Sequence, residues 1–109
     1  MDKNQTYLVR IKEEIVVILK AIAGFDEDLF LENEIIQRAV CMSLITIGEC
    51  VNHLSEDFIE EHTQIPWFEI VAARNIAAHG YWQLDMKQIW KAIIEDVPLL
   101  KEFVERWIG

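Results

Sequence analysis

The sequence contains little glycine and proline, with four Gly and two Pro among 109 residues. That scarcity argues against a turn-rich all-β fold and favours a few long helices. No apolar run approaches the roughly 18 residues that a transmembrane helix needs. The first ten residues are polar and of mixed charge, unlike a secretory signal. We therefore expect no membrane association and a cytoplasmic location.

Cysteine and basic residues are also scarce. Cys41 and Cys50 lie nine residues apart in one apolar stretch, which predicts small core residues rather than a disulfide or a metal site. The chain has ten Lys and Arg residues and 19 Asp and Glu residues, for a net charge of −9. Residues 1–54 carry five basic and nine acidic groups, and residues 55–109 carry five and ten, so no basic arm is concealed in the total. This balance argues against broad, charge-driven binding of nucleic acid, and any such activity requires a local site or sites pooled between subunits.

Hydrophobic residues make up 52% of the chain, which is incompatible with intrinsic disorder. Their three- and four-residue spacing predicts helices over residues 2–23, 34–54, 67–79 and 85–107, the last kinked at Pro98 and begun by Asp85. One turn around Asp28–Leu31 and a short helix capped by Ser55 are also expected. The helix over 34–54 is apolar on more than one face, so it is central or shared with another chain. The predicted fold is an all-α single domain over residues 1–109, an up-and-down helical bundle of three long helices plus shorter ones.

Packing alone does not explain residues 74–81, Arg-Asn-Ile-Ala-Ala-His-Gly-Tyr. Arg74 falls among apolar neighbours, where a charged group needs an anion or a carboxylate such as Glu49. Asn75 and His79 are four residues apart and share one helical face. Arg74 and His79 are five apart, about 140° around a straight helix. Either the last turn unwinds at Gly80, the expected residue after the helix end, or the site is assembled from two chains.

Arginine, asparagine and histidine suit RNA cleavage without a metal. A histidine can take the 2′-hydroxyl proton or protonate the leaving oxygen, and an arginine can hold the phosphate and balance the charge of the transition state. His79 lies at a helix C-terminus, where the dipole favours the imidazolium, so it suits the general acid better. Tyr81 can donate to a phosphate or ribose oxygen.

No cofactor or metal ion is expected. The chain contains no zinc-protease motif, glycine-rich phosphate loop or nucleophile elbow. His53 and His62 are expected to be solvated, and a metal site built on them is disfavoured.

The pattern Arg-x4-His-x-Tyr, with Asn directly after the Arg, resembles the signature of the HEPN superfamily and more closely that of its HepT-like toxins. Other stretches agree with the toxins in order and spacing: Gln37-Arg38-Ala39, Ile47-Gly48-Glu49, Ile65-Pro66-Trp67, Leu84-Asp85, Trp90 and Pro98-Leu99-Leu100. The resemblance covers nearly the whole chain from Leu8 onward.

The resemblance implies a homodimeric helical bundle in which two copies of the motif share one cleft. Arg74 and His79 would be the catalytic pair of a metal-independent endoribonuclease, with Asn75 in support. From the residues alone, Glu49 and Tyr81 are further supporting candidates, Glu49 by orienting Arg74. It also implies the toxin of a toxin–antitoxin pair, neutralised by a minimal nucleotidyltransferase antitoxin that in some systems adenylylates the motif tyrosine, here Tyr81. AMP on this residue would exclude the RNA phosphate by its bulk and charge.

Simpler explanations exist for the same residues. Arg74 can form a structural ion pair with Glu49, His79 can cap its helix, and Tyr81 can be a core aromatic with its hydroxyl at the surface. The tryptophans are expected in the core or at an interface, and Trp82 alone is a candidate for base stacking. The alternative function is a non-catalytic subunit that binds nucleotide or a nucleotidyltransferase partner, which the acidic charge favours. The motif favours the ribonuclease.

Overall fold

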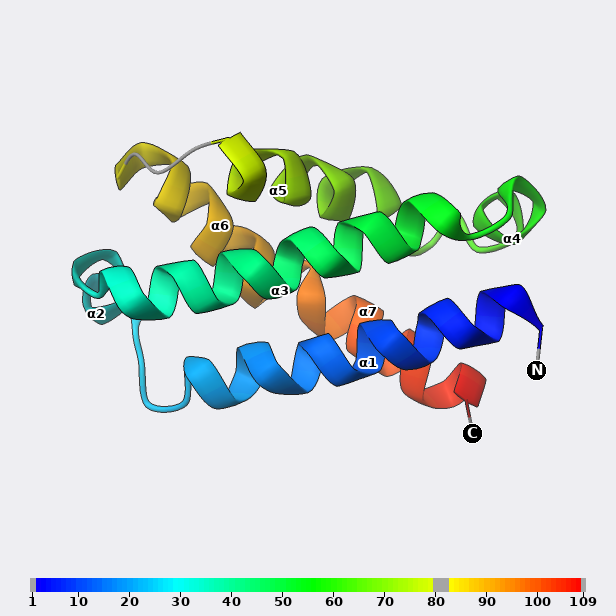
Figure 1. Ribbon diagram of the computed structural model, residues 1–109, viewed down its shortest axis with the longest axis horizontal. Helices are drawn as coiled ribbons and strands as arrows, with labels where there is room; N and C mark the ends of the chain where they lie inside the picture. The colour runs from blue at the N-terminus through cyan, green and yellow to red at the C-terminus, as the bar shows by residue number, and fades with distance from the viewer. Residues whose placement is uncertain (1, 80–82, 109) are drawn as a thin grey trace.

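The computed structural model describes residues 2–79 and 83–108, which form seven α-helices and no strand. The helices are α1 (Lys3–Ala21), α2 (Glu27–Glu32), α3 (Glu34–His53), α4 (Glu56–Glu61), α5 (Trp67–His79), α6 (Gln83–Glu95) and α7 (Val97–Ile108). Helix α3 lies between α1 and α5 and packs against both, while α6 and α7 cover the side behind it (Figure 1). The predicted all-α bundle is confirmed.

Short polar side chains start four of the helices. Asp2, Asp26, Asn33 and Ser55 each accept a hydrogen bond from the backbone N–H three residues ahead. Each such cap typically contributes about 1 kcal/mol, because the first N–H groups of a helix have no partner within it. The cap at Ser55 and the helical turn around Asp28–Leu31 were both predicted, and both are confirmed.

The C-terminal helix differs from the prediction, because α6 and α7 replace one kinked helix over residues 85–107. The break lies at Asp96, and Asp85 falls within the first turn of α6 rather than before it. Pro98 is the second residue of α7, a position where its missing N–H is not required. The buried residues Ile89, Ile93, Val97, Leu100 and Val104 keep helical spacing across the break, so periodicity alone could not reveal it.

The core lies where α1, α3, α5, α6 and α7 meet. Its largest fully buried side chains include Leu8, Ile15, Leu44, Ile70 and Met86. Helix α5 packs against α3 and α6 and leaves Phe68, Glu69, Asn75 and His79 exposed.

Both cysteines are buried and free, as predicted. Burial raises the pKa of the Cys41 thiol to about 11 and also raises the pKa of Cys50. Both thiols are therefore protonated at neutral pH and suit packing rather than catalysis.

The two histidines outside the motif differ in their environments. His53 is exposed and stacks on Tyr7. His62 was expected to be solvated, and this prediction is wrong. Its Nδ1 lies 2.8 Å from the carbonyl oxygen of Phe58, and its ring packs among Phe58, Phe103 and Trp107. Within residues 2–79 and 83–108, no cluster of potential metal ligands is present, and no helix is long and apolar enough to span a bilayer.

Candidate active site

Helix α5 carries the predicted catalytic residues, and its first turn is anchored firmly. Trp67 is buried, and its indole N–H donates to the carbonyl of His62 at 2.9 Å. Ile70, Ala73 and Ala77 continue the buried face toward the core. The helix remains regular through His79, its last residue. The last turn therefore does not unwind before His79.

The side chain of Arg74 extends from α5 along the interface with α3, and its guanidinium group projects toward the surface. Nη2 lies 3.4 Å from Oε1 of Glu49, and Nη1 donates to Oδ1 of Asn75 at 3.0 Å. The Arg74 side chain is 28% exposed and that of Glu49 is 57% exposed. The predicted contact with Glu49 is thus present, although it is a long, partly solvated ion pair rather than a buried one. Such pairs contribute about 0–1 kcal/mol to the free energy of unfolding, so the ion pair with Glu49 does little to stabilise the fold.

Asn75 and His79 lie on one exposed line of α5, four residues apart. Within the described residues, no hydrogen bond or ion pair engages the His79 imidazole. Since α5 is unbroken, His79 lies about 140° around the helix from Arg74. The structure therefore brings Arg74, Asn75 and Glu49 together, while the side chains of Arg74 and His79 leave α5 in different directions.

Gly80, Tyr81 and Trp82 lie outside the described residues. The predicted helix-end role of Gly80, the supporting and modification roles of Tyr81, and base stacking by Trp82 therefore have no structural counterpart here.

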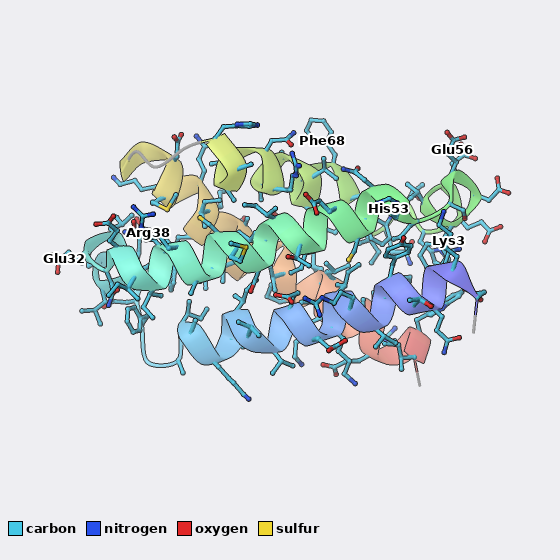
Figure 2. All side chains as sticks on the ribbon, in the orientation of Figure 1. Lys3, Glu32, Arg38, His53, Glu56 and Phe68 are labelled. Carbon is cyan, nitrogen blue, oxygen red and sulfur yellow. The ribbon has the colours of Figure 1, made fainter. Side chains whose placement is uncertain are left out.

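The exposed faces of α3 and α5 carry the three most exposed large hydrophobic side chains among the described residues: Ile35 (79%), Met42 (66%) and Phe68 (80%, labelled in Figure 2). Ile35 and Met42 are seven residues apart on α3, and Glu49 follows after seven more, so all three share one side of the helix. On α5, Phe68 and Asn75 have the same spacing. The apolar residues thus share their helix faces with site residues. Met42 and Phe68 were not among the predicted site residues, although both fall outside the helical spacing of the buried positions on α3 and α5.

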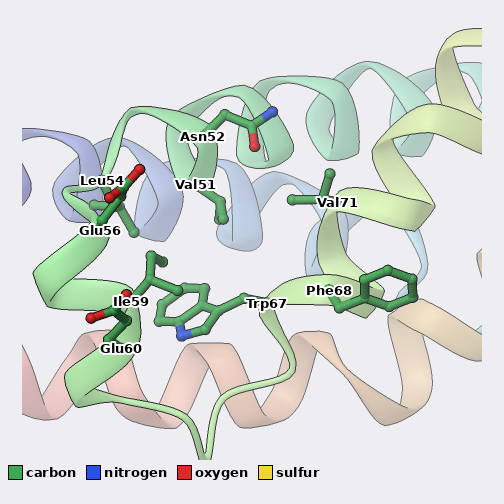
Figure 3. Close-up of a pocket in the computed structure, with 9 residues that line it drawn as sticks. All are labelled: Val51, Asn52, Leu54, Glu56, Ile59, Glu60, Trp67, Phe68 and Val71. Atoms are coloured by element: carbon green, nitrogen blue, oxygen red, sulfur yellow. The ribbon is translucent and has the colours of Figure 1, made fainter.

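An apolar groove adjoins Phe68, between the end of α3, α4 and the start of α5 (Figure 3). Its volume is about 430 Å³, and its apolar lining includes Val51, Ile59 and Trp67. Glu56 and Glu60 also line it, whereas Arg74 and His79 do not. In Figure 3 the rings of Trp67 and Phe68, both of which line the groove, point in opposite directions. The groove is therefore distinct from the predicted catalytic residues.

Comparisons with known proteins agree with the resemblance found in the sequence. Residues 11–107 match the family described as "Ribonuclease HepT-like". A protein of Methanocaldococcus jannaschii that is named as a candidate RNase is 35% identical over 101 residues, covering 93% of each chain. A protein of Thermococcus cleftensis named "Probable ribonuclease HepT" is 33% identical over 103 residues, covering 94% of each chain. A second candidate RNase, from Caldanaerobacter subterraneus subsp. tengcongensis, is 30% identical over 96% of this chain and 94% of its own.

No solved structure matches this chain significantly. The match to the family and these relatives favour the enzyme over the non-catalytic subunit. This chain belongs to the HepT-like ribonuclease family.

Proposed function

We propose that this ribonuclease is a metal-independent endoribonuclease whose active site combines Arg74 from one chain with His79 from a second copy. The observation that carries the proposal is the uninterrupted course of α5 through His79. Five residues of regular helix separate Arg74 and His79 by about 140° and about 7.5 Å along the axis. Within one chain the side chains of Arg74 and His79 thus leave α5 in different directions, and a second copy can supply the missing partner.

The reaction follows from the chemistry of the two side chains. The ribose 2′-hydroxyl loses its proton to water as its oxygen attacks the adjacent phosphorus, and the bond from phosphorus to the 5′-oxygen breaks, which leaves a 2′,3′-cyclic phosphate and a 5′-hydroxyl. His79, the last residue of α5, acts as the general acid that protonates the leaving 5′-oxygen. Arg74 offers its terminal nitrogens to the phosphate, whose charge grows in the transition state. Asn75 holds Nη1 of Arg74 in place.

The proposed homodimer interface consists of the exposed faces of α3 and α5 that carry Ile35, Met42 and Phe68. Large side chains as exposed as Ile35, Met42 and Phe68 indicate a surface that another chain covers. Phe68 projects beside an open apolar groove, and two copies related by a two-fold axis can fill such a groove reciprocally. Because Asn75 and Glu49 share these helix faces, the same contact would bring two sets of site residues together.

Substitution of the two proposed catalytic residues tests the function. Arg74→Ala and His79→Ala are each expected to abolish RNA cleavage while the dimer and its circular dichroism spectrum persist. Matched controls are Arg106→Ala and His53→Ala, which replace exposed residues near the ends of α7 and α3; both should cleave RNA at the wild-type rate. Full activity in either Arg74→Ala or His79→Ala would refute the assignment of that residue.

We also propose that the protein is a growth-arresting toxin of the cytoplasm, neutralised by a minimal nucleotidyltransferase antitoxin that adenylylates Tyr81. Membership of the HepT-like family and the position of Tyr81, two residues after His79, support this proposal. Incubation with that partner and ATP should add the mass of one AMP, and Tyr81→Phe should prevent the addition. Neutralisation without any added AMP would instead indicate that the antitoxin only occludes the site.

A further inference from the structure

Gly48 lies in the middle of α3, is buried, and faces the side-chain stem of Arg74. A Cβ atom built on Gly48 would meet Cβ and Cγ of Arg74 at distances that real Cβ atoms essentially never show. These two atoms belong to the rigid base of the arginine side chain and not to its flexible end. Any side chain at position 48 must therefore displace the stem of Arg74 or separate α3 from α5.

The position of this stem decides which nitrogens of Arg74 can reach a ligand. Nε is buried, and it has no hydrogen-bond partner within the described part of the chain. Nη1 and Nη2 contact Asn75 and Glu49, whose side chains lie at the surface. An anion from solvent therefore cannot reach the Nε edge of the guanidinium group, and only its two terminal nitrogens are available.

We propose that Gly48 is a positioning residue for Arg74, and this inference rests on the proposed ribonuclease function. Because position 48 has no side chain, the Arg74 stem can lie within the α3–α5 interface, and only Nη1 and Nη2 then face outward. The substrate phosphodiester then binds end-on to these two nitrogens, sharing them with Asn75 and Glu49. A glycine within a helix is intrinsically less favourable than alanine, so its occurrence here requires this kind of local reason.

The first test compares Gly48→Ala with a matched core variant, Ala92→Val. Ala92 lies buried on α6 and lines a groove with Ala73 and Ile76 of α5, so the added bulk perturbs α5 from its α6 side and does not meet the Arg74 stem that faces Gly48. Gly48→Ala is expected to reduce kcat at least about tenfold with a smaller change in KM, because a misplacement of about 1 Å can cost up to about a hundredfold. Ala92→Val should keep kcat within about twofold of wild type at a comparable loss of Tm. Wild-type kcat in Gly48→Ala would overturn the proposal, and so would an equal loss in both variants.

A second test measures the contact itself without using activity. Alanine at position 48 should lower Tm when Arg74 is present. In an Arg74→Gly background, where Cβ and Cγ are gone, it should no longer lower Tm, because the substitution then only improves helix propensity. The same loss of Tm in both backgrounds would show that Gly48 serves helix spacing and not Arg74. If the wild-type protein cleaved no RNA, the proposed function would fail while this coupling persisted, and Gly48 would then be a packing residue only.

Discussion

A composite site predicts that two inactive variants restore each other. In a hybrid dimer of Arg74→Ala and His79→Ala subunits, one site pairs the intact Arg74 of the second subunit with the intact His79 of the first. The other site has neither residue. One of two sites is therefore complete, and the hybrid should cleave RNA at about half the wild-type rate per dimer.

The assay uses the two variants co-expressed with different affinity tags and purified over both tags in succession. Each variant alone should be inactive in the same fluorescent RNA cleavage assay. The matched control pairs Arg74→Ala with the double variant Arg74→Ala/His79→Ala, because this hybrid exchanges subunits in the same way but contains no intact Arg74. An inactive first hybrid, with both subunits present by mass spectrometry, would show that Arg74 and His79 act within one chain, and it would refute the geometric argument from α5.

Three further predictions concern the interface, the fold and pH. Phe68→Glu should shift the protein from dimer to monomer in light scattering, whereas Val17→Glu, on the exposed side of α1, should leave it dimeric; the opposite pattern would move the interface to α1. The Gln37 amide donates to two carbonyl oxygens of α2 at 2.8 and 3.1 Å. Gln37→Glu should therefore cost about 2 kcal/mol in urea unfolding at neutral pH, with partial recovery in acid. Gln88→Glu, which is exposed and adds the same charge, should cost little, and equal losses would refute the role of those two bonds. Burial, with Glu69 and Glu95 nearby, raises the pKa of Asp96, so its ionised form destabilises the fold above that pKa. Asp96→Asn should thus raise Tm at neutral pH, with the gain vanishing in acid; a gain that grew in acid would contradict this sign.

Much of the fold was predictable because its signals are local. The caps, the apolar spacing and Gly24, which has a φ of +80° after α1, act within a few residues. The division at Asp96 was missed because the buried stripe continues through it. The environment of His62 was missed because its aromatic neighbours Phe103 and Trp107 arrive from α7, about 40 residues later in the chain.

The candidate site was predictable in composition but not in geometry. Its residue types and their spacing on one helix indicated RNA cleavage, and the Arg74–Glu49 contact was foreseen. The position of the Arg74 side-chain stem within the α3–α5 interface could not be predicted, because it depends on how closely α3 approaches α5 at Gly48. The exposed apolar residues Met42 and Phe68 were also missed, since a sequence does not show which of its hydrophobic residues fail to reach the core.

The net charge of −9 also fits this account. A broad acidic surface repels RNA, so affinity must come from a small number of local cationic groups. Arg74 is such a group, and the proposed dimer would bring two copies of it into one cleft. The acidic balance thus agrees with both alternatives that the sequence left open, a local site or sites pooled between subunits.

The most direct measurement is a digest of defined RNA by the purified wild-type protein in excess EDTA, followed by analysis of the product ends. We expect internal cleavage that leaves 2′,3′-cyclic phosphate and 5′-hydroxyl ends, with none from His79→Ala. Cleavage that needs added Mg²⁺ or Mn²⁺, or that leaves 3′-hydroxyl and 5′-phosphate ends, would contradict the metal-free mechanism.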